Sequence, residues 1–242
     1  MNEQKKYEFT GEIKVVFGIN FKQIRAIINF GCVVAGEIGG WIECEENLSQ
    51  SGNAWVSGNA SVSGNAWVYG DASVSGNASV SGNASVSGNA SVSGNASVSG
   101  NASVSGNAWV SGNASVYGDA SVSGNAWVYG DASVSGNASV SGNASVSGNA
   151  SVSGDAWVYG DADVKKDDDY MVIGGAGRYN RFTTFFKCRD KTIKVICGCF
   201  FGTIIEFRAK VKETHKGNKH EKVYLAMADM AELQIGNDEV EK

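Results

Sequence analysis

Four side chains near the carboxyl end of the chain are the first candidates for chemistry: Cys197, Cys199, His215 and His220. Thiolates and imidazoles are the ligands that Zn²⁺ prefers in proteins. The C-G-C spacing is tighter than that of usual zinc pairs, and H-x4-H lies at the edge of the usual range. Two interpretations are open, a zinc site or two partly buried thiols near two surface histidines, and the spacing favours the second.

A glycine-rich stretch, residues 174–177, stands just before Arg178 and could form a turn that binds phosphate. A phosphate loop needs a helix N-terminus directly after the glycines, and the sequence does not indicate one there. A plain β-turn is therefore favoured, and we expect no cofactor.

Six basic residues lie from position 178 to position 194, close to Phe185 and Phe186. Such a mixture could contact nucleic acid, but acidic residues are interspersed and residues 165–242 carry a net charge of only +3. We expect no nucleic-acid partner, and we assign Arg178 and Arg181 to a protein interaction instead.

The middle of the chain contains no general base. Residues 51–164 repeat the phrase S-G-N-A-S-V nineteen times with small variations, and they contain no His, Cys, Lys, Arg or Glu. Without a base there is little to activate a hydroxyl or an amine. We therefore expect a protein that is not an enzyme.

The phrase itself predicts the architecture. In A-S-V, alternation places Ala and Val on one side of a short strand and Ser on the other, and S-G-N supplies a turn. Three such sides make a coil of 18 residues, so that residue n lies over residue n+18 and each corner Asn can bond to the next. The fold is expected to be mainly β, a parallel β-helix roughly 30 Å long with a Val and Ala interior.

The aliphatic residue at every sixth position, with a small residue two places before it, resembles the hexapeptide repeat of left-handed parallel β-helices. The resemblance covers all nineteen phrases and implies the left-handed sense. Enzymes of that family are acyltransferases that use a His projecting from a coil and a loop inserted between coils. This repeat has neither, so an acyltransferase with an atypical site is kept only as an alternative.

Aromatic residues interrupt the repeat at fixed places. Trp replaces the outward Ser five times, and Tyr replaces the turn Ser four times, each Tyr followed two residues later by Asp. They are the products of duplication, covering the backbone, or they form a recognition surface. The candidates for such a surface are Trp55, Trp109, Trp127, Tyr69, Tyr117 and Tyr129, of which the three Trp share one face.

The sequence divides into residues 1–50, an N-terminal β cap with an irregular first coil; 51–164, the repeat; 165–169, a charged hinge; and 170–242, a small α+β tail domain. In the cap we expect strands over 7–13 and 21–28, and a first coil that carries Val34, Ile38 and Ile42. In the tail we expect strands over 170–173, 181–187 and 192–197. Two helices follow, one from the capping box at Thr203 to about residue 214 and one over 219–235. The second should bury Val223, Met227, Met230 and Ile235.

Both ends resemble parts of phage and prophage proteins. In the cap, F-G-C-V-V-A-G, G-G-W and N-L-S carry the resemblance, over residues 30–49, to hexapeptide-repeat proteins often labelled transferases. In the tail, T-T-F-F, C-G-C-F-F-G-T and T-H-K-G-N-K-H carry it, over residues 183–220. The resemblance implies a phage origin and no particular activity.

These patterns predict a non-enzymatic phage or prophage protein, a rigid β-helix that carries a recognition tail and binds a protein of the host. A virion component is the alternative, and an ice-binding surface is disfavoured because the outward residue is Ser rather than Thr. Five Cys, an odd number, and the lack of a leader or a membrane span indicate the cytoplasm of a bacterial host or a virion. The flat faces could pack into homo-oligomers.

Overall fold

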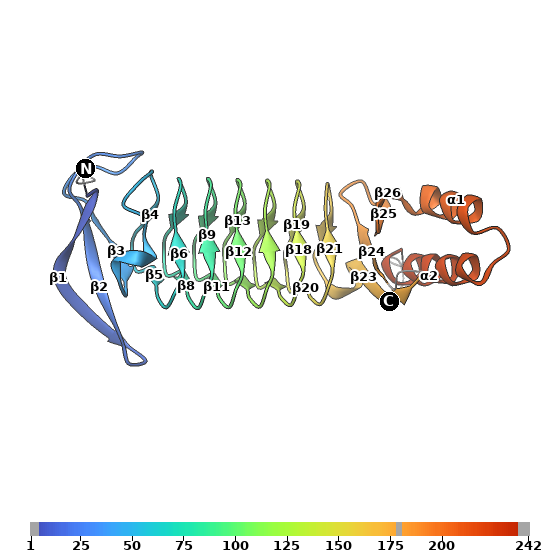
Figure 1. Ribbon diagram of the computed structural model, residues 1–242, viewed down its shortest axis with the longest axis horizontal. Helices are drawn as coiled ribbons and strands as arrows, with labels where there is room; N and C mark the ends of the chain where they lie inside the picture. Colours follow the sequence, from blue (N-terminus) through green and yellow to red (C-terminus); the bar gives the residue numbers. More distant parts are fainter. Residues whose placement is uncertain (1–4, 178–180, 237–242) are drawn as a thin grey trace, which may run out of the picture.

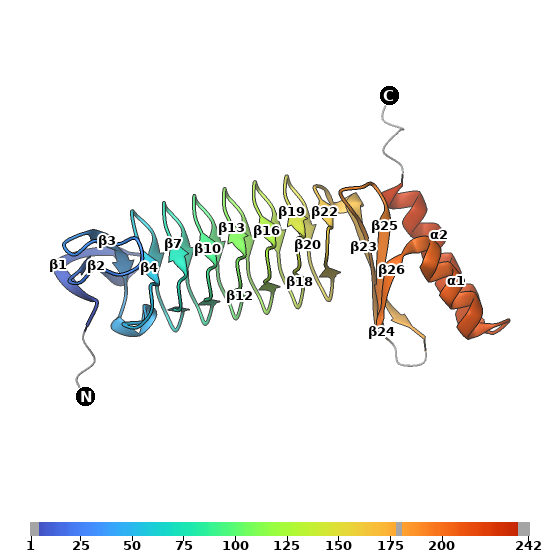
Figure 2. The same ribbon diagram turned by 90° about the horizontal axis from the view of Figure 1, so that it is seen from above.

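A computed structural model describes residues 5–177 and 181–236 of the chain. The chain forms a rod of parallel coils, closed at one end by a β-hairpin cap and at the other by a sheet with two helices (Figure 1). A view turned by 90° shows the coils stacked one after another along the axis of the rod (Figure 2). The predicted parallel β-solenoid with coils of 18 residues is confirmed, since Ser91 pairs with Trp109 and Val92 with Val110.

Each coil contributes one short strand to each of three faces. The serine face consists of β5 (Ser61–Val62), β8 (Ser79–Val80), β11 (Ser97–Val98), β14 (Ser115–Val116), β17 (Ser133–Val134) and β20 (Ser151–Val152). The tryptophan face consists of β4 (Trp55–Val56), β7 (Ser73–Val74), β10 (Ser91–Val92), β13 (Trp109–Val110), β16 (Trp127–Val128), β19 (Ser145–Val146) and β22 (Asp163–Val164). The third face consists of β6 (Trp67–Val68), β9 (Ser85–Val86), β12 (Ser103–Val104), β15 (Ser121–Val122), β18 (Ser139–Val140) and β21 (Trp157–Val158).

The interior of the rod is filled by the Val and Ala of every phrase, all of them fully or almost fully buried. The corners are tight turns in which Gly has positive φ and the Ala N–H donates to the Ser carbonyl three residues earlier. At Gly100, φ is 72° and an added Cβ would lie 2.9 Å from the backbone N of Gly118 in the next coil. Only glycine fits there, because stacked corners approach backbone to backbone.

Side-chain amides form the predicted ladders along the corners. Asn77 donates to the Oδ1 of Asn95, and Asn95 donates to the Oδ1 of Asn113, each over 3.0 Å. Asn113 then donates to Asp131 over 2.8 Å, and a carboxylate has no proton to pass on. Each corner Asp therefore ends one run of the ladder.

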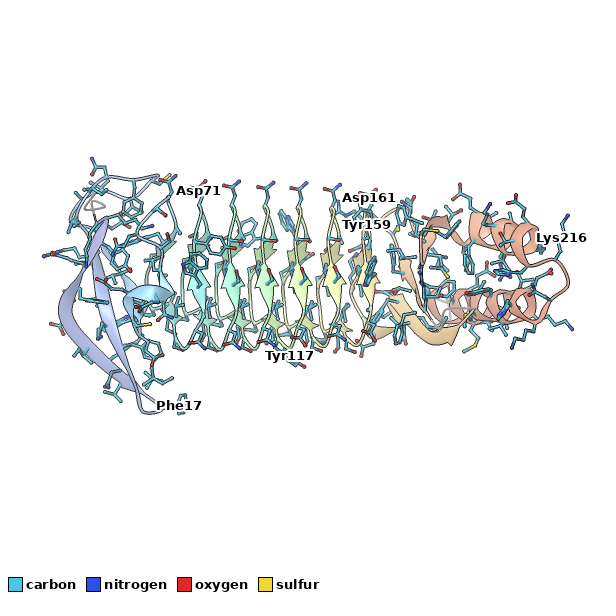
Figure 3. All side chains as sticks on the ribbon, viewed as in Figure 1. Phe17, Asp71, Tyr117, Tyr159, Asp161 and Lys216 are labelled. Carbon is cyan, nitrogen blue, oxygen red and sulfur yellow. The ribbon has the colours of Figure 1, made fainter. Side chains whose placement is uncertain are left out.

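The N-terminal cap consists of β1 (Tyr7–Val16), β2 (Ile19–Ala26), β3 (Ile38–Ile42) and a 3-10 turn, η1 (Glu45–Asn47). The β1–β2 hairpin projects sideways from the rod, with Phe17 at its tip (Figure 3). Its turn lies at Phe17–Gly18, so β1 runs three residues beyond its predicted end, and β2 begins and ends two residues before its predicted bounds. Strand β3 joins the cap to the rod by pairing in parallel with β5, which extends the serine face into a nine-stranded sheet.

The predicted first coil is only partly right. Ile42 is fully buried and continues the column of core residues. Val34 and Ile38 are 62% and 50% exposed, because this stretch runs outward to pair with the hairpin rather than around the rod.

The backbone hydrogen bonds between coils point in one direction along the rod. The N–H groups of each coil donate to carbonyls of the following coil, as Trp55 N does to Ala72 O over 2.9 Å. The first coil is therefore left with unbonded carbonyls, and the cap provides donors for them. The Lys6 ammonium donates to the carbonyls of Ser51, Gly52 and Ala54, at 3.5, 3.3 and 2.7 Å.

The last coil has the opposite requirement, acceptors for its N–H groups. Ser151 N donates to Asp167 Oδ1 over 2.7 Å, and Trp157 N donates to Thr184 Oγ1 over 3.1 Å. Asp167 belongs to a second 3-10 turn, η2 (Asp167–Asp169), within the segment predicted to be a hinge. Its residues therefore form a regular turn that bonds to the last coil.

The tail is an antiparallel sheet of β23 (Tyr170–Ala176), β24 (Arg181–Lys187), β25 (Ile193–Cys197) and β26 (Phe200–Thr203), with α1 (Ile204–His215) and α2 (Lys219–Ile235) packed on it. The predicted capping box is present, since Glu206 N donates to Thr203 Oγ1 and Thr203 N to Glu206 Oε2. Strand β26 was not predicted. Helix α2 buries Tyr224, Ala228 and Ala231 with Met227 and Ile235, whereas Val223 and Met230 face outward, against expectation.

Candidate functional site

Exposed tryptophans lie on two faces of the rod: Trp109 and Trp127 on the tryptophan face, and Trp67 and Trp157 on the third face. Trp109 and Trp127 are in adjacent coils, and their ring centroids are 5.2 Å apart in an edge-to-face arrangement. Trp109 is 44% exposed and Trp127 is 48% exposed. Tyr129 follows at the corner toward the serine face and is 39% exposed. We call Trp109, Trp127 and Tyr129 the aromatic patch. Large rings held on a rigid sheet lose little side-chain entropy on binding, which suits them to contact a partner.

The other tryptophans have different surroundings. Trp55 lies on the same face as predicted, but it is only 6% exposed because Tyr7 and Phe30 of the cap cover it, with ring centroids 6.4 and 5.4 Å away. Its assignment to an interaction surface is therefore wrong. Trp67, on the third face, stacks on Tyr69 at 4.0 Å.

The tyrosines lie along the coil that follows them. The Ser87 and Ser85 hydroxyls hydrogen-bond to Tyr69 and lower its pKa, and Ser135 and Ser133 do the same for Tyr117. Figure 3 shows Tyr117 on the edge of the rod opposite to Asp71. These contacts agree with the interpretation that the tyrosines cover backbone, although Tyr117 remains 46% exposed.

The last Tyr of the series marks the junction with the tail. Where earlier tyrosines reach a Ser of the next coil, Tyr159 contacts Phe201 of β26 instead, edge-to-face at 5.4 Å. Trp157, Tyr159 and Phe201 line a hollow of about 320 Å³ between the third face and the tail. The W-V-Y-G-D block at this end therefore helps to seat the tail.

The cysteines and histidines of the tail do not assemble a metal site. Cys197 ends β25 and its Sγ accepts from Thr183 Oγ1 over 3.1 Å, whereas Cys199 is exposed in the turn before β26. The rings of His215 and His220 are 5.7 Å apart, at the end of α1 and the start of α2. Over residues 5–177 and 181–236, no three His, Cys, Asp or Glu side chains are grouped so as to hold an ion.

The glycine-rich stretch is not a phosphate loop. Gly174 and Gly175 lie in β23, where its pairing with β24 is interrupted, and a Cβ on Gly174 would lie 2.5 Å from the Phe182 ring. Phe185 and Phe186, near the six basic residues in the sequence, are fully buried and do not reach the surface. Arg181 lies at the start of β24, and Arg178 falls outside the described residues.

No protein-family model matches the chain, and no curated protein matches it. In the described part of the chain, no helix has the length and apolar content that crossing a membrane requires.

Three residues with structural roles were missed in the sequence: Lys6, Asn47 and Thr184. Each is almost fully buried, and each bonds to backbone groups at an end of the rod. Only the direction of the backbone could have indicated them, since a donor is needed before the first coil and an acceptor after the last.

Proposed function

We propose that the protein is a non-enzymatic interaction protein of phage or prophage origin, a left-handed hexapeptide-repeat rod that binds a protein of the bacterial host. The observation that supports this proposal is the aromatic patch. Two exposed tryptophans lie side by side on a surface that otherwise presents Ser and Asn. Exposed aromatic residues clustered in this way often mark protein-binding sites.

The rest of the rod is consistent with a binding role. Its outward Ser and Asn are accompanied by no His, Cys, Lys or Arg, so that an acyl transfer would lack a base on the coils. The six Asp of the repeat make the rod acidic. A host protein with a basic surface around an apolar pocket would complement both features.

The test is co-purification from a bacterial host, with a variant that restores the consensus phrase. Trp109→Ser with Trp127→Ser removes the two rings and leaves a residue that the repeat already uses at this position. Trp67→Ser, on the third face, is the matched control. We expect the wild type and the control to retain one stoichiometric protein, identified by mass spectrometry, and the double variant to lose it.

Other outcomes discriminate the alternatives. A partner that the double variant retains would contradict the role of the patch and direct attention to the tail. No partner with any variant would favour a virion component with the rod as a spacer. Saturable binding of an acyl-coenzyme donor in a calorimeter would favour the acyltransferase alternative.

A further inference from the structure

A cavity of about 560 Å³ lies in the tail, between the turn that joins β25 to β26 and the two helices. Its volume falls within the range of pockets that enclose small organic ligands. It is remote from the aromatic patch, on the far side of the junction with the rod. None of the proposed functions of the rod requires it.

The inner wall of the cavity is apolar and mostly aromatic. Phe207 lies at its centre, with ring centroids of Phe200 and Tyr224 at 5.5 and 5.9 Å, and Val211 adds an aliphatic surface. Phe207, Val211 and Tyr224 are buried in the tail core and therefore held in place. A wall of this kind suits a flat apolar body, which can lie against ring faces and edges.

The polar residues of the cavity are cationic or neutral. Arg181, Lys210 and His215 line it, and the described lining residues include no Asp or Glu. The guanidinium of Arg181 lies against Gly198, where a Cβ would be 3.0 Å from Nη1, and φ of +61° further restricts this position to glycine. Lys210 pairs with Glu213 over 2.9 Å, and both residues line a second hollow on the other side of Lys210; Glu213 does not line the cavity itself.

Tyr224 completes the polar side of the wall. Burial, with the neighbouring Cys197 thiol, raises the pKa of Tyr224 to about 12, so that its hydroxyl is neutral at physiological pH. Its described lining residues therefore present positive charge and hydrogen-bond donors around an apolar surface, and none of them is negatively charged. Such a site favours an anion over a neutral or cationic compound of the same shape.

We propose that this cavity is a binding site for a small organic anion with a flat apolar body, in which the body lies against Phe207 and the anionic group faces Arg181 and Lys210. The proposal does not depend on the function proposed for the rod.

The test uses the full chain and two dyes that differ in charge. Anilinonaphthalene sulfonate has a flat body with a sulfonate, and N-phenylnaphthylamine has the same body without it. We expect saturable binding of the sulfonate, with fluorescence enhancement, and binding of the neutral dye weaker by about tenfold, the effect of one charge-assisted contact.

Three variants locate the site, and two serve as controls. Thr214→Trp, at an exposed rim position, fills the mouth without altering the core and should weaken both dyes by more than about tenfold. Arg181→Gln and Lys210→Gln should each weaken the sulfonate by about fivefold and leave the neutral dye unchanged. Lys212→Gln, on the same helix but outside the cavity, is the matched control. Phe17→Ser removes the most exposed apolar ring of the cap, where a dye could bind nonspecifically.

Binding that Phe17→Ser abolishes and Thr214→Trp leaves intact would overturn the proposal. Equal affinity for the two dyes, or an equal loss with Lys212→Gln and Lys210→Gln, would overturn the anionic part of it. Circular dichroism and a cooperative thermal transition for each variant exclude a dye signal from an unfolded tail.

Discussion

Each end of the rod has a 3-10 turn of the same geometry, and the two turns differ in the side chain at their last position. At the N-terminal end, η1 places the Oδ1 of Asn47 where it accepts from the N–H of Glu43 and of Cys44, at 3.1 and 3.0 Å. At the C-terminal end, η2 places the Oδ2 of Asp169 in the same relation to Lys165 and Lys166, at 2.9 and 3.1 Å. The residue before each turn has nearly the same backbone conformation, φ −142° and −143°.

The difference lies on the other side of the corner. Asn47 also donates, through Nδ2, to the carbonyls of Gly64 and Ala66, both at 2.9 Å, because the coil beyond it presents carbonyls. Beyond Asp169 lies Lys187 of the tail, with 3.7 Å between Nζ and Oδ1. A parallel coil therefore resembles an α-helix in one respect: its two ends expose opposite backbone groups and require opposite caps.

Exchanging the side chains of the two turns should give the largest difference in stability between the two ends. We expect Asn47→Asp to lower the free energy of unfolding by about 3–5 kcal/mol, because it buries a carboxylate against two carbonyls. Asp169→Asn keeps the acceptor and weakens one ion pair, and it should cost about 1 kcal/mol. Urea unfolding measures both.

Asn59→Asp is the control for this exchange, since Asn59 belongs to an exposed ladder and donates only to Asn77. Its effect should stay below about 0.5 kcal/mol. If Asn47→Asp and Asn59→Asp destabilised the protein equally, the buried donors of Asn47 would have no special role.

At the N-terminal end, the titration of Lys6 should make the stability of the protein depend on pH. Burial lowers the pKa of Lys6 to about 8, from 10.5 in the unfolded chain. The unfolded state therefore binds more protons between these values, and stability rises with pH from about 8 to 10.5. We expect wild type to gain about 2 kcal/mol over Lys6→Met between pH 7 and pH 9.5.

Urea unfolding of the two proteins in parallel measures this difference, in which the titration of all other groups cancels. A constant difference at the two pH values would mean that the Lys6 amine stays ionised in the folded protein.

Removing one acceptor should affect the C-terminal side more modestly. Thr184→Val keeps the shape of the side chain and removes the oxygen that accepts from Trp157 N. We expect a loss of about 1–2 kcal/mol, since the buried N–H is left unsatisfied. Ser139→Ala, on the outer surface of the same sheet as Trp157, is the control in the same urea experiment, and an equal effect of the two would contradict the role of Thr184 as a cap.

The smallest effect should come from between the two ends. Asp131 stops a ladder run, and Asp131→Asn would allow a further donation to Asn149. We expect an increase of about 0.3 kcal/mol, because the ladder is exposed, or roughly 1 °C in Tm. Scanning calorimetry of the single variant and the wild type measures it, and an unchanged or lower Tm would contradict a continuous ladder.

The periodic part of this fold was predictable from the sequence and the ends were not. The six-residue period determines the register, the faces and the burial of every Val, and the capping box at Thr203 located the start of the first helix. Val34 and Ile38 have suitable spacing for a first coil, but spacing does not say that the chain leaves the rod to meet the hairpin.

The candidate site was predictable only in part, for a related reason. Trp55 and Trp109 stand in identical phrases on one face. The cap lies over Trp55 and buries it, whereas Trp109 is far from the cap and stays exposed. The tail cavity was not predicted, because its lining comes from β24, the β25–β26 turn and two helices. Apolar residues such as Phe207 in these elements are indistinguishable in the sequence from ordinary core residues.

Because each phrase turns the chain through one third of a circuit, the number of phrases between the caps sets an angle as well as a length. Adding or removing three phrases would move the tail along the axis by about 4.8 Å and keep its orientation. Adding one phrase would swing the tail by about 120° around the axis, since three sides complete a coil. The nineteen phrases thus fix the direction in which the tail cavity faces relative to the projecting hairpin, and the duplication of a single phrase would change that direction.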